Sequence, residues 1–256
     1  MTTTAFVIAL ALAAPGGDWP QWRGPGRDGT TTALAGAAWP KELKRAWKTA
    51  VGEGHSGPVV SGDRVFVLAR QGEIEELLSL DLATGRVLWR QGEPAPYTMN
   101  PAAQSHGKGP KATPTVQDGK VYTLGISGTL TCRDAGSGRV VWRQDGKTRF
   151  RETSPYYGAA QSPLVDGGLV IVHLGGHDDG ALSAFDAATG ALKWERKGEG
   201  PAYASPVVAE IGGVRQVVTD TQDHLAGFAA ATGASLWSLP LSTDYTQNAV
   251  TPVVRG

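Results

Sequence analysis

The sequence predicts an all-β fold, namely a β-propeller built from four-stranded antiparallel blades. Glycine makes up 35 of the 256 residues, about 14% and roughly twice the usual share, so many chain reversals are expected. No long window shows the apolar periodicity of a helix. A single unit recurs four times, and its prolines at positions 58, 114, 163, 206 and 252 lie 43 to 56 residues apart. That spacing is typical of propeller blades.

Each repeat reads Ser/Thr/Gly-Pro-x-Val, then an apolar run, then Asp-x-x-Thr-Gly-x-x-x-Trp. It contains about four short runs of aliphatic and aromatic residues separated by Gly, Asp and Thr, as expected for a meander of strands A to D. The blades are therefore expected at residues 57–91, 113–144, 162–196 and 205–239.

The Asp-x-x-Thr-Gly-x-x-x-Trp segment is placed where strand C turns into strand D. Its glycine is expected to need a positive φ, while the aspartate and threonine side chains bond turn amides. The tryptophan is expected to pack between blades. In the fourth repeat Ala229 replaces the aspartate. The structural docking positions are Trp47, Asp81, Gly85, Trp89, Asp134, Gly138, Trp142, Asp186, Gly190, Trp194, Gly233 and Trp237.

Two further segments match parts of the repeat outside the four blades. Residues 46–50 match an outer strand D, and residues 250–256 match the start of another strand A. Strands A and D of one blade lie three strand spacings apart, roughly 14 Å, so they cannot pair directly. The propeller, residues 46–256, is therefore expected to contribute four complete blades to a larger ring of seven or eight, with the remaining blades missing from this chain.

The first residues have the pattern of an export signal. The apolar run from Ala5 to Ala14 is too short to span a bilayer, and Ala11-Leu12-Ala13 fits a cleavage site. Residues 1–14 are expected to be a signal peptide, and residues 15–45 an N-terminal extension. No transmembrane segment is expected, and the predicted location is the periplasm or the exterior of a bacterial cell.

Composition also limits the possible functions. The 24 basic residues balance 24 acidic ones, and the sequence pI is near 7.0, which argues against a protein that mainly binds nucleic acid. The single cysteine, Cys132, excludes an intramolecular disulfide or a catalytic dithiol. It is expected to be a small core residue in a C strand.

Binding is expected on the face where the D–A and B–C connections emerge. The C–D turns on the opposite face hold the repeated motif, whereas the D–A connections are long and varied, especially Arg90 to Ala112. No catalytic constellation or phosphate-binding loop is found. Lys108 and Lys111 fit either a solvated loop or contacts to an anionic ligand. The candidate ligand-binding residues are His55, Tyr97, His106, Lys108, Lys111, Tyr156, Gln161 and Tyr203.

A metal site is the less favoured interpretation of one B–C connection. His173, His177 and Asp178 have the right side chains for a divalent ion. Their spacing crosses a Gly-Gly turn, however, and no third histidine lies nearby in the sequence. A polar, exposed hairpin is therefore favoured.

Two segments carry a family resemblance. The complete motif from Ala184 to Trp194 resembles the tryptophan docking motif of quinoprotein-like (PQQ-like) β-propellers, which include BamB and the quinoprotein alcohol dehydrogenases. Residues 18–29 resemble the N-terminal signature of exported PQQ-binding-like β-propeller repeat proteins. The resemblance covers nearly all of residues 18–256.

Proteins of this superfamily range from redox enzymes to non-catalytic scaffolds, so the resemblance implies two functions. The favoured one is an exported, non-catalytic scaffold that binds a protein or a small-molecule ligand through its D–A and B–C loops. The alternative is a fragment of a PQQ-dependent oxidoreductase whose catalytic residues lie in missing blades. PQQ with calcium is implied by the resemblance only, because the vicinal cysteine pair and acidic groups common in quinoprotein dehydrogenases find no match in this sequence.

Overall fold

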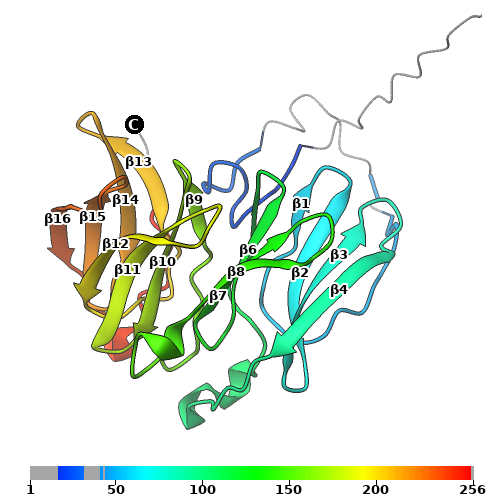
Figure 1. Ribbon diagram of the computed structural model, residues 1–256, viewed down its shortest axis with the longest axis horizontal. Helices are drawn as coiled ribbons and strands as arrows, with labels where there is room; N and C mark the ends of the chain where they lie inside the picture. The colour runs from blue at the N-terminus through cyan, green and yellow to red at the C-terminus, as the bar shows by residue number, and fades with distance from the viewer. Residues whose placement is uncertain (1–16, 32–40, 43, 255–256) are drawn as a thin grey trace, which may run out of the picture.

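The computed structural model contains four separate antiparallel sheets (Figure 1). It describes residues 17–31, 41–42 and 44–254. The expected signal peptide, residues 1–14, and part of the expected extension lie outside this range. Within the described part of the chain, no helix is long and apolar enough to cross a membrane.

Each sheet is a meander whose four strands pair in chain order. Blade 1 contains β1 (Val59–Ser61), β2 (Arg64–Gln71), β3 (Ile74–Asp81) and β4 (Val87–Pro94). Blade 2 contains β5 (Thr115–Gln117), β6 (Lys120–Leu124), β7 (Thr129–Asp134) and β8 (Val140–Asp145). Blade 3 contains β9 (Leu164–Asp166), β10 (Leu169–Gly176), β11 (Asp179–Asp186) and β12 (Leu192–Gly198). Blade 4 contains β13 (Val207–Ile211), β14 (Val214–Asp220), β15 (His224–Ala229) and β16 (Ser235–Pro240).

Three short 3₁₀ segments lie in the D–A connections: η1 (Pro101–His106), η2 (Gly146–Thr148) and η3 (Asp244–Thr246). The innermost strands β1, β5 and β9 contact one another in sequence order. The four-bladed, all-β propeller arrangement predicted from the repeats is therefore confirmed.

The core lies between the sheets, because each sheet buries apolar side chains on the faces it turns to its neighbours. Phe66 and Leu68 of blade 1 pack with Val121 of blade 2, and Tyr122 of blade 2 packs with Val170 of blade 3. Cys132 in β7 is fully buried in the second of these clusters, as expected for a small core residue. Burial raises the pKa of the Cys132 thiol to about 11.

The Asp-x-x-Thr-Gly turns adopt the expected geometry. Gly85, Gly138, Gly190 and Gly233 have φ between 65° and 75°. In blade 3, Oδ1 of Asp186 accepts hydrogen bonds from the N–H and hydroxyl of Thr189, at 2.9 and 3.0 Å. Blades 1 and 2 repeat these two bonds. The bond from the Thr189 N–H, followed by that from its hydroxyl, lowers the pKa of Asp186 to about 2.

Four tryptophans dock on the glycine of the following turn. A Cβ at Gly190 would lie 2.7 Å from the ring of Trp142, so only glycine fits beneath that indole. Each indole N–H donates, at 2.9 to 3.2 Å, to the carbonyl next to the motif aspartate position. The pairs are Trp47–Leu82, Trp89–Ala135, Trp142–Ala187 and Trp194–Ala230. These four tryptophans therefore pack between neighbouring structural units.

Trp237 departs from this pattern. Its indole N–H donates to Oε1 of Gln216 in its own blade, at 2.7 Å, and its ring covers Gly227. The same strand, β16, also exposes Leu236 and Leu239. The sequence prediction of an interblade contact for Trp237 is therefore not met among the described residues, because no following turn lies against it.

The two terminal segments that match parts of the repeat are unpaired in the described part of the chain. Residues 46–50 and 251–254 form no strand, because neither segment has a strand beside it to pair with in the described part of the chain. Trp47 nevertheless docks on Gly85, as the repeat pattern requires. The repeat pattern thus agrees with the docking of Trp47 on Gly85, and the pairing of both segments with further blades stays a prediction.

A chain of hydrogen bonds explains the Ser/Thr-Pro signature. The N–H of this position in one blade donates to the hydroxyl at the same position in the next blade. The pairs are Gly57–Thr113 at 3.0 Å, Thr113–Ser162 at 2.9 Å, Ser162–Ser205 at 2.9 Å and Ser205–Thr251 at 3.3 Å. We call this series the hydroxyl ladder. Gly57 has no hydroxyl, so in this series it is only a donor.

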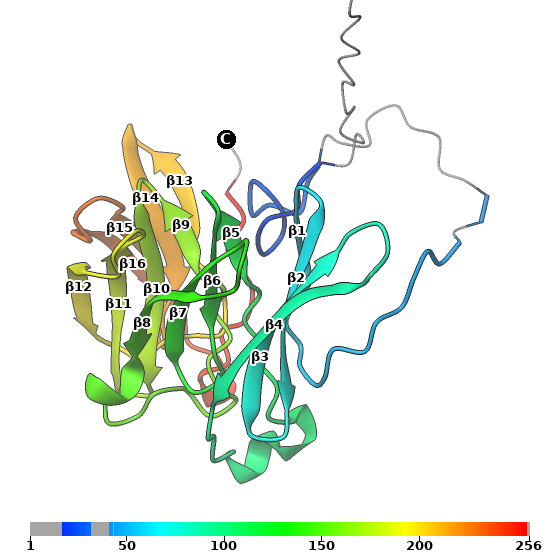
Figure 2. The same ribbon diagram turned by 45° about the vertical axis from the view of Figure 1, so that its right-hand side comes forward.

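Residues 18–29 tie the inner strands together (Figure 2). Trp19 pairs with Val60 of β1, and the carbonyl of Pro20 accepts the N–H of Val116 in β5. The Trp22 indole donates to the Thr251 hydroxyl at 3.1 Å. This N-terminal segment therefore bridges blade 1, blade 2 and the last ladder residue.

Arg27 extends the same bridge to blade 3. Its guanidinium donates to the carbonyls of Ser162 and Pro163, at 3.0 and 2.9 Å, and the residue is only 3% exposed. Burial lowers the pKa of Arg27 to about 9. The Asp18–Gly29 signature thus has a structural role at the centre of the blades.

Candidate ligand-binding face

The D–A and B–C connections form one face of the propeller, which we call the loop face; the opposite side, with the A–B and C–D turns, is the turn face. The loop face lies at the bottom of Figure 1, where η1 is seen. Five of the six tyrosines and four of the five histidines lie in or beside its connections. They are Tyr97, Tyr156, Tyr157, Tyr203, Tyr245, His55, His106, His177 and His224.

The centre of this face is built from one repeated position, two residues before each ladder residue. The residues at this position are His55, Lys111, Ala160, Tyr203 and Ala249. The backbone holds two of them identically, because the N–H of His55 bonds Pro110 O at 2.8 Å and that of Tyr203 bonds Asn248 O at 2.9 Å. Equivalent backbone positions in successive blades thus present different side chains around one centre.

Four of these five residues line a hollow of about 310 Å³, which we call the mouth hollow. The others that line it are His106, Tyr157 and Gln247, which come from three D–A connections. The small side chains of Ala160 and Ala249 leave the space, while the rings form its walls. A concave site with mostly apolar walls and a few polar groups is typical of ligand binding.

Three rings in the mouth hollow hold one another in place. The His106 and Tyr157 ring centroids lie 5.0 Å apart, and those of Tyr157 and Tyr203 lie 5.7 Å apart, both in edge-to-face geometry. The Tyr157 N–H donates to the Tyr203 hydroxyl at 3.3 Å, and Gln247 Nε2 donates to the Tyr157 hydroxyl at 3.1 Å. Burial raises the pKa of Tyr203 to about 12, so its hydroxyl stays protonated at neutral pH.

The two candidate lysines have different environments. Lys108 is exposed and pairs with Glu73 at 3.5 Å. The Nζ atom of Lys111 is buried and has no hydrogen-bond partner among the described residues. Burial lowers the pKa of Lys111. Of the two alternatives left open by the sequence, the solvated-loop interpretation suits Lys108 and not Lys111.

The other candidate residues lie outside the mouth hollow. Nε2 of His55 is 3.0 Å from the carbonyl of His106, and the ring of Tyr156 packs against His177 in a tilted arrangement with centroids 4.1 Å apart. Tyr97 is half-buried, and burial raises its pKa. Gln161 is 1% exposed and its Nε2 donates to the Ala202 carbonyl. Gln161 therefore serves the packing between connections.

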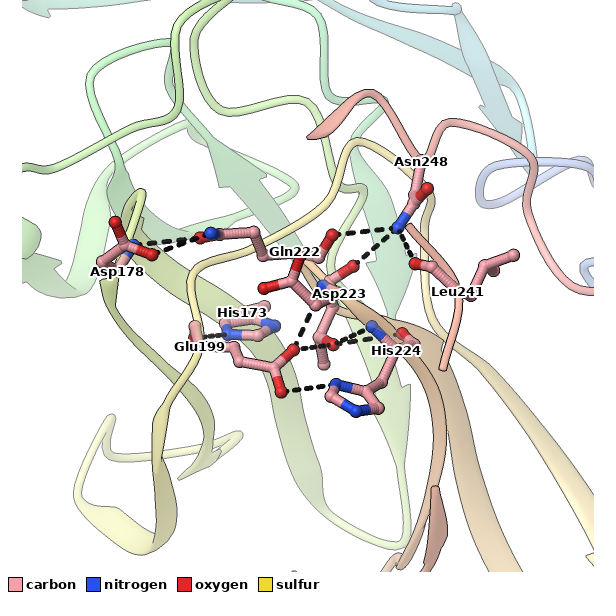
Figure 3. Close-up of polar contacts among 9 residues, drawn as sticks. His173, Asp178, Glu199, Gln222, Asp223, His224, Leu241 and Asn248 are labelled. Carbon is pink, nitrogen blue, oxygen red and sulfur yellow. Dashed lines mark hydrogen bonds and ion pairs between the residues drawn. The ribbon is translucent and has the colours of Figure 1, made fainter. Parts of the chain in front are cut away.

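The residues of the alternative metal site point to separate partners (Figure 3). Nε2 of His173 lies 2.9 Å from the Glu199 carbonyl, and Asp178 accepts a bond from Gln222 Nε2 at 2.8 Å. His177 contacts Tyr156 and, through Nδ1, the Thr246 hydroxyl. Burial lowers the pKa of His173 to about 4, so this ring stays neutral at physiological pH.

A second polar cluster on the loop face is centred on Glu199 (Figure 3). Nδ1 of His224 lies 2.6 Å from Glu199 Oε1, while the Thr221 hydroxyl and the Asp223 N–H donate to Oε2. Burial opposes ionisation of Glu199, but the bonds from Thr221 and Asp223 and the proximity of His224 outweigh it and lower its pKa. The cluster fixes the connection that carries Tyr203 to the end of blade 4.

Asp220, at the end of β14, is a buried carboxyl group beside this cluster. It is 3% exposed, and burial raises its pKa to about 6. Asn248 donates to the carbonyls of Thr221, Gln222 and Leu241, which holds the last D–A connection over this end of the blade (Figure 3).

The residues present do not fit the PQQ and calcium implied by the resemblance. In the described ranges, no three His, Cys, Asp or Glu side chains group together as metal ligands. The mouth hollow also has no tryptophan in its wall to stack on a planar cofactor. The site is better suited to binding through tyrosine and histidine rings.

Of the candidate residues predicted from the sequence, the structure brings His106, Lys111 and Tyr203 together around the mouth hollow. Tyr157, Gln247 and the two alanines of the same hollow were not among those candidates. The sequence does contain a signal for part of this set, because the position two residues before each ladder residue is the same in every repeat. Residues from the preceding loop, such as Tyr157, have no such register.

A family model and several known proteins are similar to this chain. The family model described as outer membrane protein assembly factor BamB matches residues 37–103 and 75–256. The protein of that name from Burkholderia pseudomallei is 29% identical over 214 residues, which are 78% of this chain and 47% of that protein. The dehydrogenase subunit of alcohol dehydrogenase (quinone) from Acetobacter aceti is 35% identical over 129 residues, 45% of this chain and 16% of that protein.

A solved structure supports the fold. The quinohemoprotein alcohol dehydrogenase of Comamonas testosteroni matches with a TM-score of 0.61 at 20% identity, covering 90% of this chain and 42% of that one. This chain thus spans about half or less of each of these relatives. With the four blades, the docked tryptophans and the family match in agreement, the chain belongs to the BamB-like family of PQQ-like β-propeller repeat proteins.

Proposed function

We propose that this protein is a non-catalytic, exported propeller that binds a protein or another ligand through its loop face. The observation that carries the proposal is the grouping of tyrosine and histidine rings around the mouth hollow. Tyrosine offers a large contact area with few rotatable bonds, so it is enriched where proteins bind partners. The similarity to assembly factors of the outer membrane adds support for a protein ligand.

The proposal is tested by capture from a bacterial envelope extract with paired variants. Tyr203→Ala removes a ring from the mouth hollow, whereas Leu192→Ala shortens a 49% exposed side chain of the outer strand β12, away from the loop face. A specific partner should be retained by the wild type and by Leu192→Ala, and reduced at least about fivefold with Tyr203→Ala. Equal capture by all three proteins, each with an unchanged melting temperature, would refute binding through this site.

Export is tested separately by fusing residues 1–30 to alkaline phosphatase, which is active only outside the cytoplasm. Active fusions with a shortened leader support the predicted signal peptide. An inactive, uncleaved fusion would contradict it.

A PQQ-dependent oxidoreductase remains the second candidate, because the Acetobacter quinone-dependent dehydrogenase is 35% identical over part of the chain. The test is incubation with PQQ and calcium, followed by dye reduction with alcohols and sugars. Turnover that depends on the cofactor would replace the scaffold proposal.

A further inference from the structure

We propose that the mouth hollow binds a carboxylate group, with Lys111 as its charge partner and the Tyr157 and Tyr203 hydroxyls as additional donors. This inference rests on the proposed function above and specifies the chemistry of the ligand. The ligand is a carboxylate of a small molecule or of an acidic polypeptide segment, and both present the same group to the site.

The first observation is the uncompensated charge of Lys111. Its Nζ atom is buried and lacks a hydrogen-bond partner, and no carboxylate of the described chain lies within ion-pair distance of it. An ammonium group taken out of water without a partner is costly, and an anion brought into the same space offsets that cost. Burial lowers the pKa of Lys111, in accordance with this environment.

The second observation is the direction of the hydrogen bonds in the walls. The hydroxyl oxygens of Tyr157 and Tyr203 each accept one bond, from Gln247 Nε2 and from the Tyr157 N–H respectively. Neither hydroxyl donates a hydrogen bond to another described residue, so both hydrogens remain for a ligand. The hollow therefore offers one ammonium and two phenol donors, a set that matches the two oxygens of a carboxylate.

The size and polarity of the site favour a carboxylate over a phosphate. A single lysine balances one negative charge, whereas a phosphate group carries nearly two at neutral pH. Ala160, Ala249 and the ring faces leave apolar walls in a space of about 310 Å³, which suits an apolar or aromatic group attached to the carboxylate.

The experiment uses the full chain and two pairs of probes in ligand-observed NMR and calorimetry. Benzoate is compared with the neutral benzamide, and a glycine peptide with one central glutamate is compared with its glutamine counterpart. We expect at least one carboxylate probe to bind about tenfold more tightly than its neutral partner. Glutamate-peptide binding identifies a polypeptide source, and benzoate binding alone identifies a small molecule.

Matched variants test whether Lys111 supplies the positive charge that binds the carboxylate. Lys111→Met should abolish the preference for the carboxylate, whereas Lys108→Met, which removes the same charge from an exposed residue paired with Glu73, should keep it. Tyr203→Phe should weaken carboxylate binding several-fold. Equal affinity for charged and neutral probes in the wild type, or an unchanged preference in Lys111→Met, would overturn the inference. Capture of a partner lost in Tyr203→Ala would still stand, so the two failures are distinguishable.

Discussion

The turn face and the loop face of this propeller use the repeat in opposite ways. On the turn face, three blades place the same carboxylate on the same amide and hydroxyl, and four tryptophans dock on glycines of nearly equal φ. On the loop face, the matching position carries histidine, lysine, alanine or tyrosine. The comparison teaches that residues shared by the repeats hold the blades together, while positions that vary between repeats are available to a ligand.

The largest expected effect tests docking at a junction. Trp142→Ala should lower the free energy of unfolding by about 4 kcal/mol, because the indole is 8% exposed between blades 2 and 3. Trp237→Ala should cost only about 1 kcal/mol, because that ring packs on its own blade. Urea denaturation measures both, and equal losses would break the link between docking and stability.

Next comes the glycine beneath the indole. Gly190→Val should destabilise by about 3 kcal/mol, because the new side chain adds a clash with Trp142 to the strain of φ +75°. Gly167→Val is the matched control, since its φ is +55° and nothing lies within 4 Å of its Cβ position. That control should lose about 1 kcal/mol. If both variants melted alike, backbone strain alone would explain the conserved geometry of the turn.

On the loop face, removing a charge should raise stability. The pKa of Asp220 is raised to about 6 in the folded state, so the folded protein binds the proton more tightly than the unfolded chain. Wild-type stability is therefore lost as pH rises from about 4 through 6. Asp220→Asn should lack this loss and be about 1–2 kcal/mol more stable than wild type at pH 7. Melting curves at pH 4 and pH 7 measure it, and an advantage that did not grow with pH would contradict the assignment.

A smaller effect is expected for the aspartate of the turn. Asp186→Ala should lower the melting temperature less than Gly190→Val does, because Ala229 already occupies this position in blade 4. The pKa of Asp186 is lowered to about 2, so its contribution is present near neutral pH and is lost as pH falls from about 4 to 2. Wild type and variant should melt together at the acid end of that range. A difference that persisted there would show that Asp186 acts through packing.

The smallest expected change in stability belongs to the mouth hollow. Tyr203→Phe removes a hydroxyl whose only described bond, from the Tyr157 N–H, is long at 3.3 Å. Its free energy of unfolding should stay within about 0.5 kcal/mol of wild type. A large loss in a chemical denaturation curve would mean that this side chain supports the fold, and the contrast between the faces would fail.

Much of the fold could be predicted from the sequence because the same pattern of strands and turns recurs in four repeats. Blade 3 was expected at residues 162–196 and extends from Leu164 to Gly198. Residues 46–50 show what the repeat pattern alone cannot predict. The tryptophan spacing reports the docking of Trp47 on Gly85, but a strand also needs a partner, and sequence similarity cannot supply one.

The candidate site was predicted less completely, for a geometric reason. The residue two positions before a ladder residue, such as Lys111 or Tyr203, reaches the mouth hollow. The residue directly before a ladder residue, such as Gln161, turns inward and is buried. Tyr157 and Gln247 join the same wall from loops 90 residues apart in the chain. Only the assembled blades bring those loops together, so their pairing leaves no local pattern in the sequence.

The hydroxyl ladder has a consequence for how such a chain can change. Successive ladder residues lie 43 to 56 positions apart in the sequence, yet each pair is joined by one bond of 2.9 to 3.3 Å. The distance between these positions in neighbouring blades is therefore nearly constant, whatever the length of chain that connects them. Insertions in a D–A connection can therefore lengthen the loop face without altering the angle of the next blade. New recognition loops can arise while the blades keep their arrangement.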